Sequence, residues 1–280
     1  MVGTRGGVWN LLFESIFRIH QKLTECYNSS MQEGQNIGLI KGTEQKYHFK
    51  VAAIKPVNVG IEGNKMFATI SSYRGEHGRY FLKSVKDETD LGVIVEKYKV
   101  LKSRTVKVPR VLKPVSLPNG DLYLLISDLS QEGKLLVVSA NNFEIHRPEY
   151  KDFVRQLPRE TRKLIEYDLI YAGFAAAGID RRNDSDFSGP RYELGGNAFL
   201  AAVDLNNPQT SHIVVGDFGR DIEPSTKSSE ELISENLGGA AFFYGALLGG
   251  VLQLPKSDKF SFMNQDLENM GTMAVKLAKY

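Results

Sequence analysis

Residues 213–219 read Ile-Val-Val-Gly-Asp-Phe-Gly, an apolar run that ends at the carboxylate of Asp217. Residues 197–203 read Asn-Ala-Phe-Leu-Ala-Ala-Val, a second apolar run that begins at Asn197. The segment between them contains Asn-Asn-Pro at 206–208, which favours a turn, so the two runs predict an antiparallel hairpin. Asn197 and Asp217 then lie at the open end of that hairpin, where their oxygen atoms can converge on one magnesium ion that bridges nucleotide phosphates.

The residues upstream of this hairpin predict a small antiparallel sheet. Runs rich in β-branched and aromatic residues, separated by turn residues, predict strands at 47–61, 66–73, 79–85, 108–115 and 121–127. Between the third and fourth runs, apolar residues recur every three or four positions from Asp87 to Leu101, which is typical of a helix with Asp87 or Thr89 as its N-cap. The sequence therefore predicts a five-stranded sheet with one helix.

The pattern becomes mainly helical after residue 128. The clearest helix is expected at 157–177, a loop without periodicity at 178–196, and further helices after the predicted hairpin. The uncharged stretch 238–254 is short and rich in glycine for a bilayer span, so we expect a buried helix there and no membrane span. The fold class is thus predicted to be α+β, with a helical extension at 1–46 in front.

The net charge and the cysteine content limit which partners and which cellular compartment we expect. The formal net charge of +2 gives no clear indication of a nucleic-acid partner. Cys26 is the single cysteine, so it cannot form an intramolecular disulfide, and we expect a reducing, cytoplasmic compartment. A basic stretch at Arg104, Lys107, Arg110 and Lys113 is expected to be solvated.

These features, taken in order, resemble the protein-kinase-like superfamily, and in particular its atypical members such as aminoglycoside phosphotransferases and HipA-like kinases. The resemblance rests on Asp217-Phe218-Gly219 after an apolar strand, on Asn197 before it, and on Lys83 within the apolar run 80–85. It implies a two-lobed fold, with 47–128 as an antiparallel five-stranded N-lobe and 129–280 as a mainly helical C-lobe.

The resemblance also implies roles for individual residues, with ATP and Mg²⁺ as cofactors. Lys83 is expected to bind the α- and β-phosphates, and Glu96 to form an ion pair that orients Lys83. Glu88 is the alternative partner if the helix has a different register. Asn197 and Asp217 are expected to hold the metal ion.

Two further positions are implied to contact the nucleotide. Gly60 and Gly63 stand where the family has its phosphate-covering loop, although only two of the usual glycines are present. Asp128 falls where the family connects its lobes and presents backbone groups to the adenine. This assignment rests on the position of Asp128 in the sequence and not on its side chain.

The expected proton acceptor is missing from its usual place. The family has an aspartate five residues before the metal-binding Asn, and that position is Tyr192 here. Asp180 directly follows the long predicted helix, as the family's base does, and an insertion can restore the geometry. Asp184 and Asp186 remain the other candidates, and the pair Arg181-Arg182 beside them can bind a phosphate or simply lie at the surface.

Two functions follow from these residues. The first is an ATP- and Mg²⁺-dependent phosphotransferase of atypical kinase type, acting on an unknown small-molecule or protein acceptor. The second is a catalytically weak or inactive pseudokinase that acts as a nucleotide-binding or protein-interaction scaffold, with the predicted helix around Trp9 and Phe13 as a docking element. The altered spacing before Asn197 favours the second function, and the presence of both metal-ligand candidates favours the first.

Overall fold

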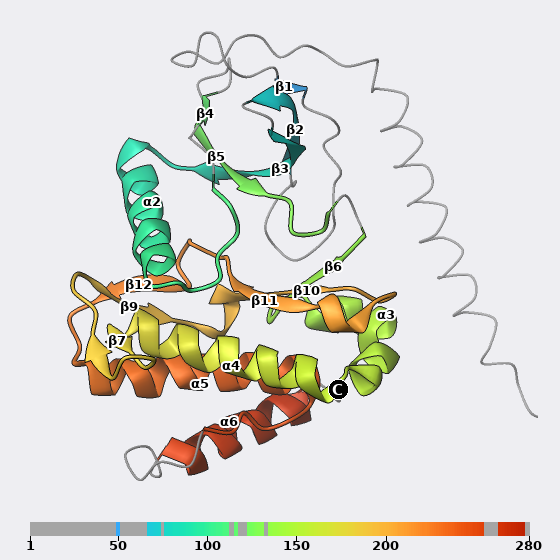
Figure 1. Ribbon diagram of the computed structural model, residues 1–280, viewed down its shortest axis with the longest axis vertical. Helices are drawn as coiled ribbons and strands as arrows, with labels where there is room; N and C mark the ends of the chain where they lie inside the picture. Colours follow the sequence, from blue (N-terminus) through green and yellow to red (C-terminus); the bar gives the residue numbers. More distant parts are fainter. Residues whose placement is uncertain are drawn as a thin grey trace, which may run out of the picture.

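The computed structural model describes residues 49–50, 66–73, 76–111, 115–116, 122–131, 134–254 and 263–277. Within them the chain is α+β, as predicted: a sheet with one helix lies at the top of Figure 1, and the other helices lie below it with several short strands between. The predicted N-terminal helix around Trp9 and Phe13, and the glycines Gly60 and Gly63, lie outside the described residues.

The upper sheet is antiparallel and has the order β1-β2-β3-β5-β4. Its strands are β1 (Phe49–Lys50), β2 (Met66–Tyr73), β3 (Glu76–Val85), β4 (Val115–Ser116) and β5 (Leu122–Ser127). β1 and β4 have two residues each, so the sheet consists mainly of β2, β3 and β5, which agree with the predicted runs. The run predicted at 108–115 forms only a bridge from Val111 to Ile126 before β4.

The predicted helix is α2 (Glu88–Ser103), and Asp87 is its N-cap. The Asp87 carboxylate accepts a hydrogen bond of 2.9 Å from the backbone N of Asp90, which satisfies one of the free donors of the first turn. The helix buries Ile94, Lys97, Tyr98 and Leu101. Three of these four belong to the predicted apolar face, whereas the buried lysine was not predicted.

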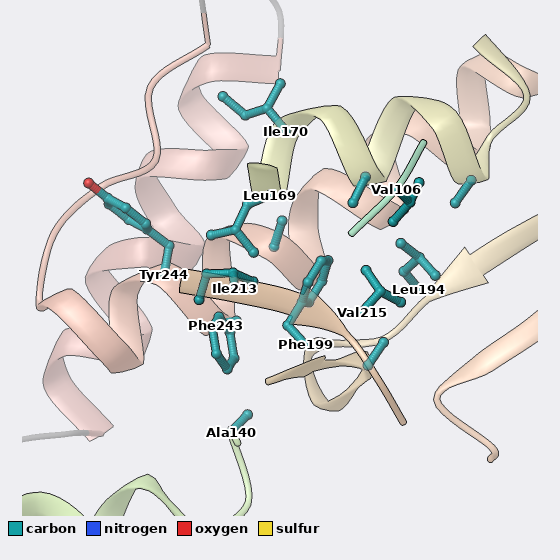
Figure 2. Packing of buried hydrophobic residues seen from close by; sticks show 14 of the residues in the cluster. Val106, Ala140, Leu169, Ile170, Leu194, Phe199, Ile213, Val215, Phe243 and Tyr244 are labelled. Atoms are coloured by element: carbon teal, nitrogen blue, oxygen red, sulfur yellow. The ribbon is translucent and has the colours of Figure 1, made fainter. Parts of the chain in front are cut away.

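Among the described residues, the lower half contains four helices and several short strands. The helices are α3 (Phe143–Gln156), α4 (Arg159–Ala176), α5 (Ser229–Leu248) and α6 (Asn264–Leu277). Figure 2 shows Phe199 and Phe243 among the buried side chains. Their ring centroids lie 5.8 Å apart. Buried apolar residues of the upper sheet, α2 and these helices form one continuous cluster.

The predicted hairpin is present as β10 (Phe199–Val203) and β11 (His212–Val215), with β6 (Leu136–Ser139) on the other side of β10. All three strands are antiparallel to their neighbours. The turn contains Asp204, whose carboxylate accepts hydrogen bonds from the backbone N of Asn206 and of Asn207. The two apolar runs quoted at the outset therefore pair with each other.

The loop prediction for 178–196 was wrong in part. This segment contains β7 (Ile179–Asp180), β8 (Ser185–Asp186) and β9 (Arg191–Leu194), and β9 pairs with β12 (Ile222–Ser225). The last strand also corrects the prediction that the chain is only helical after the hairpin. Strands of two to four residues carry too little alternation to be seen locally, and the β9–β12 pairing joins distant segments.

The stretch 238–254 contains the second half of α5, which is buried as predicted and ends at Leu248. A capping box between Ser228 and Glu231 begins the helix, and Gly249 is its C-cap, with a φ of 60° that favours glycine. A Cβ at Gly239 would lie 2.5 Å from the carbonyl oxygen of Leu194, so the glycine lets α5 approach β9 closely. Among the described residues, no helix is both long enough and apolar enough to cross a membrane.

Arg104 corrects the prediction of a solvated basic stretch, because it is only 2% exposed. Its guanidinium donates hydrogen bonds to the carbonyl oxygens of Ala175 at 2.9 Å, Ser188 at 3.0 Å and Pro190 at 2.8 Å. Arg104 thus adds a donor to a carbonyl at the end of α4 and binds two carbonyls in the segment before β9. Burial lowers the pKa of Arg104 below its ordinary value.

Asn236, at the centre of the lower half, also forms hydrogen bonds from its side chain to buried backbone groups. It is fully buried on α5; its Oδ1 accepts a hydrogen bond of 2.7 Å from Leu194 N, and its Nδ2 donates to the carbonyl oxygens of Gly173 and Tyr192, both at 3.0 Å. One side chain therefore ties α5 to α4 and to β9, and all of these polar groups are paired.

Replacing Asn236 with Ala is expected to lower the free energy of unfolding by about 3 kcal/mol, because buried backbone groups lose their partner. Chemical denaturation of the two proteins measures the difference. Ser234→Ala, at an exposed position on the same helix, is the control and should stay within about 0.5 kcal/mol of the wild type. Equal stabilities of Asn236→Ala and wild type would contradict this account.

Candidate functional site

The ion pair between Lys83 and Asp217 forms the centre of the candidate site. Lys83 lies on β3 and Asp217 lies two residues after the end of β11, and Lys83 Nζ is 3.1 Å from Asp217 Oδ1. The two side chains are 25% and 35% exposed, so each retains access to solvent. The fold therefore brings together the two charged residues on which the sequence prediction mainly rests.

The tripeptide at 217–219 is held by its own backbone and by α2. Gly219 N donates a hydrogen bond of 3.2 Å to Asp217 Oδ1. Phe218 is fully buried, and its ring meets that of Tyr98 edge-on at 5.8 Å. A Cβ at Gly219 would lie 3.2 Å from Asp217 Oδ1 and 3.6 Å from Lys83 Nζ, so a side chain there would press on the ion pair.

Asn197 lies in the 3₁₀ turn η1 (Gly196–Ala198), directly before β10. The β10–β11 register pairs Phe199 with Val215, and extending it by two residues places position 197 opposite position 217. Backbone hydrogen bonds support this extension, because the carbonyl oxygen of Ala198 accepts from Gly216 N at 2.9 Å and from Asp217 N at 3.4 Å. The two metal-ligand candidates thus lie at the same end of the hairpin.

The donor set at this end consists of one carboxylate and one amide. In the part of the chain that the structure describes, no group of three or more His, Cys, Asp or Glu residues is placed to hold a metal ion. Mg²⁺ commonly takes one or two protein oxygens and completes its shell with phosphate and water. Asp217 and Asn197 fit that pattern, because Asp217 Oδ1 serves Lys83 and Gly219 N, while no hydrogen bond to a described residue uses its Oδ2 or the Asn197 amide.

The expected ion pair between Lys83 and Glu96 is not formed in this structure. Glu96 is exposed, and so is the alternative Glu88 in the first turn of α2. The physical reason is the register of α2, which turns the neighbouring Lys97 inward. Lys97 Nζ donates a hydrogen bond of 3.0 Å to the carbonyl oxygen of Gly219.

Lys97 is a site residue that sequence reasoning missed. The signal was present, because position 97 continues the spacing of three and four residues that joins Ile94 and Leu101 on the inner face. Burial lowers the pKa of the Lys97 ammonium, and the nearby charge of Lys83 adds to the effect, while Glu223, Asp90 and Asp217 oppose it. Lys97 is 7% exposed.

The carboxylate of Asp180 is hydrogen-bonded to residues of its own loop. It is 6% exposed, and its carboxylate accepts hydrogen bonds from Asn183 Nδ2 at 2.7 Å, from Arg182 N at 3.1 Å and from Arg182 Nε at 3.4 Å. Burial raises the pKa of Asp180, but these hydrogen bonds outweigh it, so the pKa lies below its ordinary value. The other two candidates for the base, Asp184 and Asp186, are exposed.

The arginines beside Asp180 pack on aromatic rings. The guanidinium of Arg181 lies 4.8 Å from the centre of the Phe174 ring, and that of Arg182 lies 4.7 Å from the centre of the Tyr171 ring. Both contacts have cation–π geometry. These interactions anchor the loop to α4, so the pair is part of the local packing.

Asp128 lies directly after β5, at the start of the connection to the lower half. Its Oδ1 accepts hydrogen bonds from Ser130 N at 3.0 Å and from Ser130 Oγ at 2.6 Å, which closes a turn. The side chain of Asp128 therefore shapes the turn that begins this connection.

Comparisons with known proteins give only distant structural likenesses. No protein-family model matches the chain, and no curated protein matches it. The kinase domain of PknI from Mycobacterium tuberculosis is similar: a double variant gives a TM-score of 0.42 at 15% sequence identity and covers 86% of this chain and 90% of that domain. Another structure of the same domain gives a TM-score of 0.40 at 14% identity.

An aminoglycoside 2'-phosphotransferase-IIIa variant in complex with GDP is also similar, with a TM-score of 0.31 at 12% identity, covering 82% of this chain and 92% of that one. TM-scores and identities at this level do not by themselves establish a shared fold.

The hydrogen bonds to Asp180 predict an acid-dependent contribution to stability. Because the pKa of Asp180 is lower in the folded than in the unfolded state, where it is about 3.9, the contribution is complete above that value and is lost as pH falls through the folded pKa. The Tm difference between wild type and Asp180→Ala should therefore be constant from about pH 7 to about pH 5 and shrink below about pH 4.

Thermal unfolding followed by circular dichroism across this pH range measures the effect. Asp186→Ala, which removes an exposed carboxylate from the same hairpin, is the control. A Tm difference for Asp180→Ala that does not change with acidification would contradict the assigned hydrogen bonds.

Proposed function

We propose that this chain is a protein-kinase-like phosphotransferase that binds ATP and Mg²⁺, with residues 47–128 as its N-lobe and residues 129–280 as its C-lobe. The observation that carries the proposal is the 3.1 Å contact between Lys83 on β3 and Asp217 at the end of β11. A lysine on the third strand and an aspartate that begins Asp-Phe-Gly are the phosphate-binding and metal-binding groups of that superfamily.

The chemistry of the site supports this assignment. The Lys83 ammonium is a point charge suited to phosphate oxygens, and the oxygens of Asp217 and Asn197 are hard ligands of the kind that Mg²⁺ prefers. When bound, the metal ion would neutralise charge on the phosphates. The chain itself orients the nucleotide through Lys83, and the buried ring of Phe218 fixes the neighbouring Asp217.

The connection that begins at Asp128 is the proposed place of the adenine. The Asp128 side chain closes its own turn on Ser130, so contacts to the base would come from backbone groups of this connection. Gly60 and Gly63 are proposed to cover the phosphates.

The proton acceptor is proposed to be one of the three acidic residues of the β7–β8 hairpin. Asp180 has the expected position after α4, but its oxygens bond to Arg182 and Asn183. A base must come within hydrogen-bond reach of the acceptor hydroxyl. The exposed residues Asp184 and Asp186 are accessible to an acceptor without breaking the hydrogen bonds that hold Asp180.

A second candidate function is that of a scaffold that binds nucleotide without transferring phosphate. Two observations favour it: the hydrogen bonds that occupy Asp180, and the absence of a Lys83–Glu96 ion pair. Formation of ADP from ATP by the purified protein, at a rate that falls in Asp217→Asn, would exclude this alternative.

The main test is the thermal stability of the protein with ATP in the presence and absence of Mg²⁺. A ligand at about 100 times its dissociation constant should add about 2.7 kcal/mol to the stability of the folded state. Mg²⁺ is expected to enlarge the shift produced by ATP, and Asp217→Asn is expected to abolish that enlargement, because an amide is a poorer ligand than a carboxylate.

Asp152→Asn, which removes a carboxylate with 85% side-chain exposure on α3, is the matched control and should behave like the wild type. The proposal would be wrong if ATP with Mg²⁺ produced no shift, or if Asp217→Asn retained the full effect of Mg²⁺.

A further inference from the structure

Lys97 is a buried ammonium group that has no directly bonded anion among the described residues. Its one hydrogen bond to the described residues goes to the carbonyl oxygen of Gly219 at 3.0 Å. An ammonium group has three N–H donors, and a carbonyl carries no formal charge. A buried charge is normally paired, because removing it from water is costly.

Three carboxylates act on Lys97 from a distance, but none of them is bonded to it among the described residues. Lys83 and Asp217 both lie close enough to act on Lys97 electrostatically, but Asp217 Oδ1 already accepts from Lys83 and from Gly219 N. Glu223 and Asp90 act on Lys97 through space, and neither forms an ion pair with it in the described part of the chain. Of the two ammonium groups, Lys83 is therefore directly bonded to a carboxylate, whereas Lys97 is bonded to a carbonyl oxygen.

The two ammonium groups approach the same residue from different elements. Lys97 on α2 donates to the Gly219 carbonyl, and Lys83 Nζ lies 3.6 Å from the place that a Cβ of Gly219 would take. Because Lys83 and Asp217 are partly exposed, an anion that reaches them also approaches Lys97. An anionic group bound there would compensate both positive charges.

We propose that Lys97 and Lys83 together bind the phosphate groups of a nucleotide, so that Lys97 supplies part of the charge neutralisation usually left to Mg²⁺ and nucleotide binding persists without the metal ion. This inference rests on the proposed nucleotide site. In protein kinases the helix gives a glutamate that pairs with the lysine of the third strand, which adds a negative charge beside the phosphates. Here the helix adds a positive charge instead.

A purely structural role for Lys97 is the competing explanation, since its hydrogen bond also ties α2 to Gly219. The two roles differ in what they affect. Loss of a structural bond lowers stability and should weaken nucleotide binding equally with and without Mg²⁺. Loss of a phosphate-binding charge weakens binding most when Mg²⁺ is absent, and an arginine at the same position should restore it because it keeps the charge.

The experiment is calorimetric titration of the full chain with ATP, once with Mg²⁺ and once with EDTA. For the wild type we expect the dissociation constants under the two conditions to differ by no more than about 10-fold. Lys97→Met, which keeps the length of the side chain, should raise the dissociation constant in EDTA by about 10-fold or more, as expected for a lost charged hydrogen bond.

With Mg²⁺ present, the effect of Lys97→Met should be smaller, and Lys97→Arg should restore most of the binding in EDTA. Lys99→Met removes an exposed lysine from the same helix and should match the wild type under both conditions. Thermal unfolding of each variant confirms that it is folded at the temperature of the titration.

The outcomes separate the two proposals. If ATP binds with Mg²⁺ but not in EDTA, or if Lys97→Met binds like the wild type in EDTA, the role of Lys97 is wrong while the nucleotide site stands. If ATP binds under neither condition, the proposed function itself is wrong.

Discussion

The ion pair between Lys83 and Asp217 joins residues that are 134 positions apart in the chain, and the rest of the site is arranged around it. A partly exposed pair of this kind contributes about 1 kcal/mol or less to stability, so it does not hold the fold together. Its geometry depends on neighbours that are buried. Phe218 is fixed in the core beside Asp217, and β3 is fixed by its pairing with β2 and β5.

Helix α2 is the element that links the upper sheet to this tripeptide. Tyr98 packs edge-on against Phe218, and its hydroxyl accepts a hydrogen bond of 3.4 Å from Val111 N. Lys97, on the same inner face, bonds to Gly219. A rotation of α2 would therefore change both the packing of the tripeptide and the charge beside it, which makes the register of this helix a determinant of the chemistry.

Two buried polar side chains hold together the segments around α4, α5 and β9, next to the site. Asn236 connects α5 to α4 and β9, while Arg104 satisfies carbonyl groups at the end of α4 and before β9. Both bond to backbone groups of short segments that pack against the end of α4, and Asn236 pairs Leu194 N and the Tyr192 carbonyl of β9. Together they fix the segments that flank the β10–β11 hairpin and its metal-ligand candidates. Asn236 and Arg104 thus affect the site indirectly, because they fix the backbone segments that surround it.

The sequence alone determined the elements with strong local signals. The period of apolar residues identified α2 and α4, and the runs of β-branched and aromatic residues between turns identified β2, β3 and β5. The order of the motifs predicted that Lys83 and Asp217 would meet. Position 97 continues the apolar spacing of α2, but only the tertiary structure showed that Lys97, and not the adjacent Glu96, bonds to the tripeptide, because a rotation of about 100° per residue separates the two side chains. The short pairings of β7, β8, β9 and β12, and the burial of Arg104, were likewise decided by partners distant in sequence. A local pattern reports neighbours along the chain, and it carries no information about which distant backbone groups require a donor.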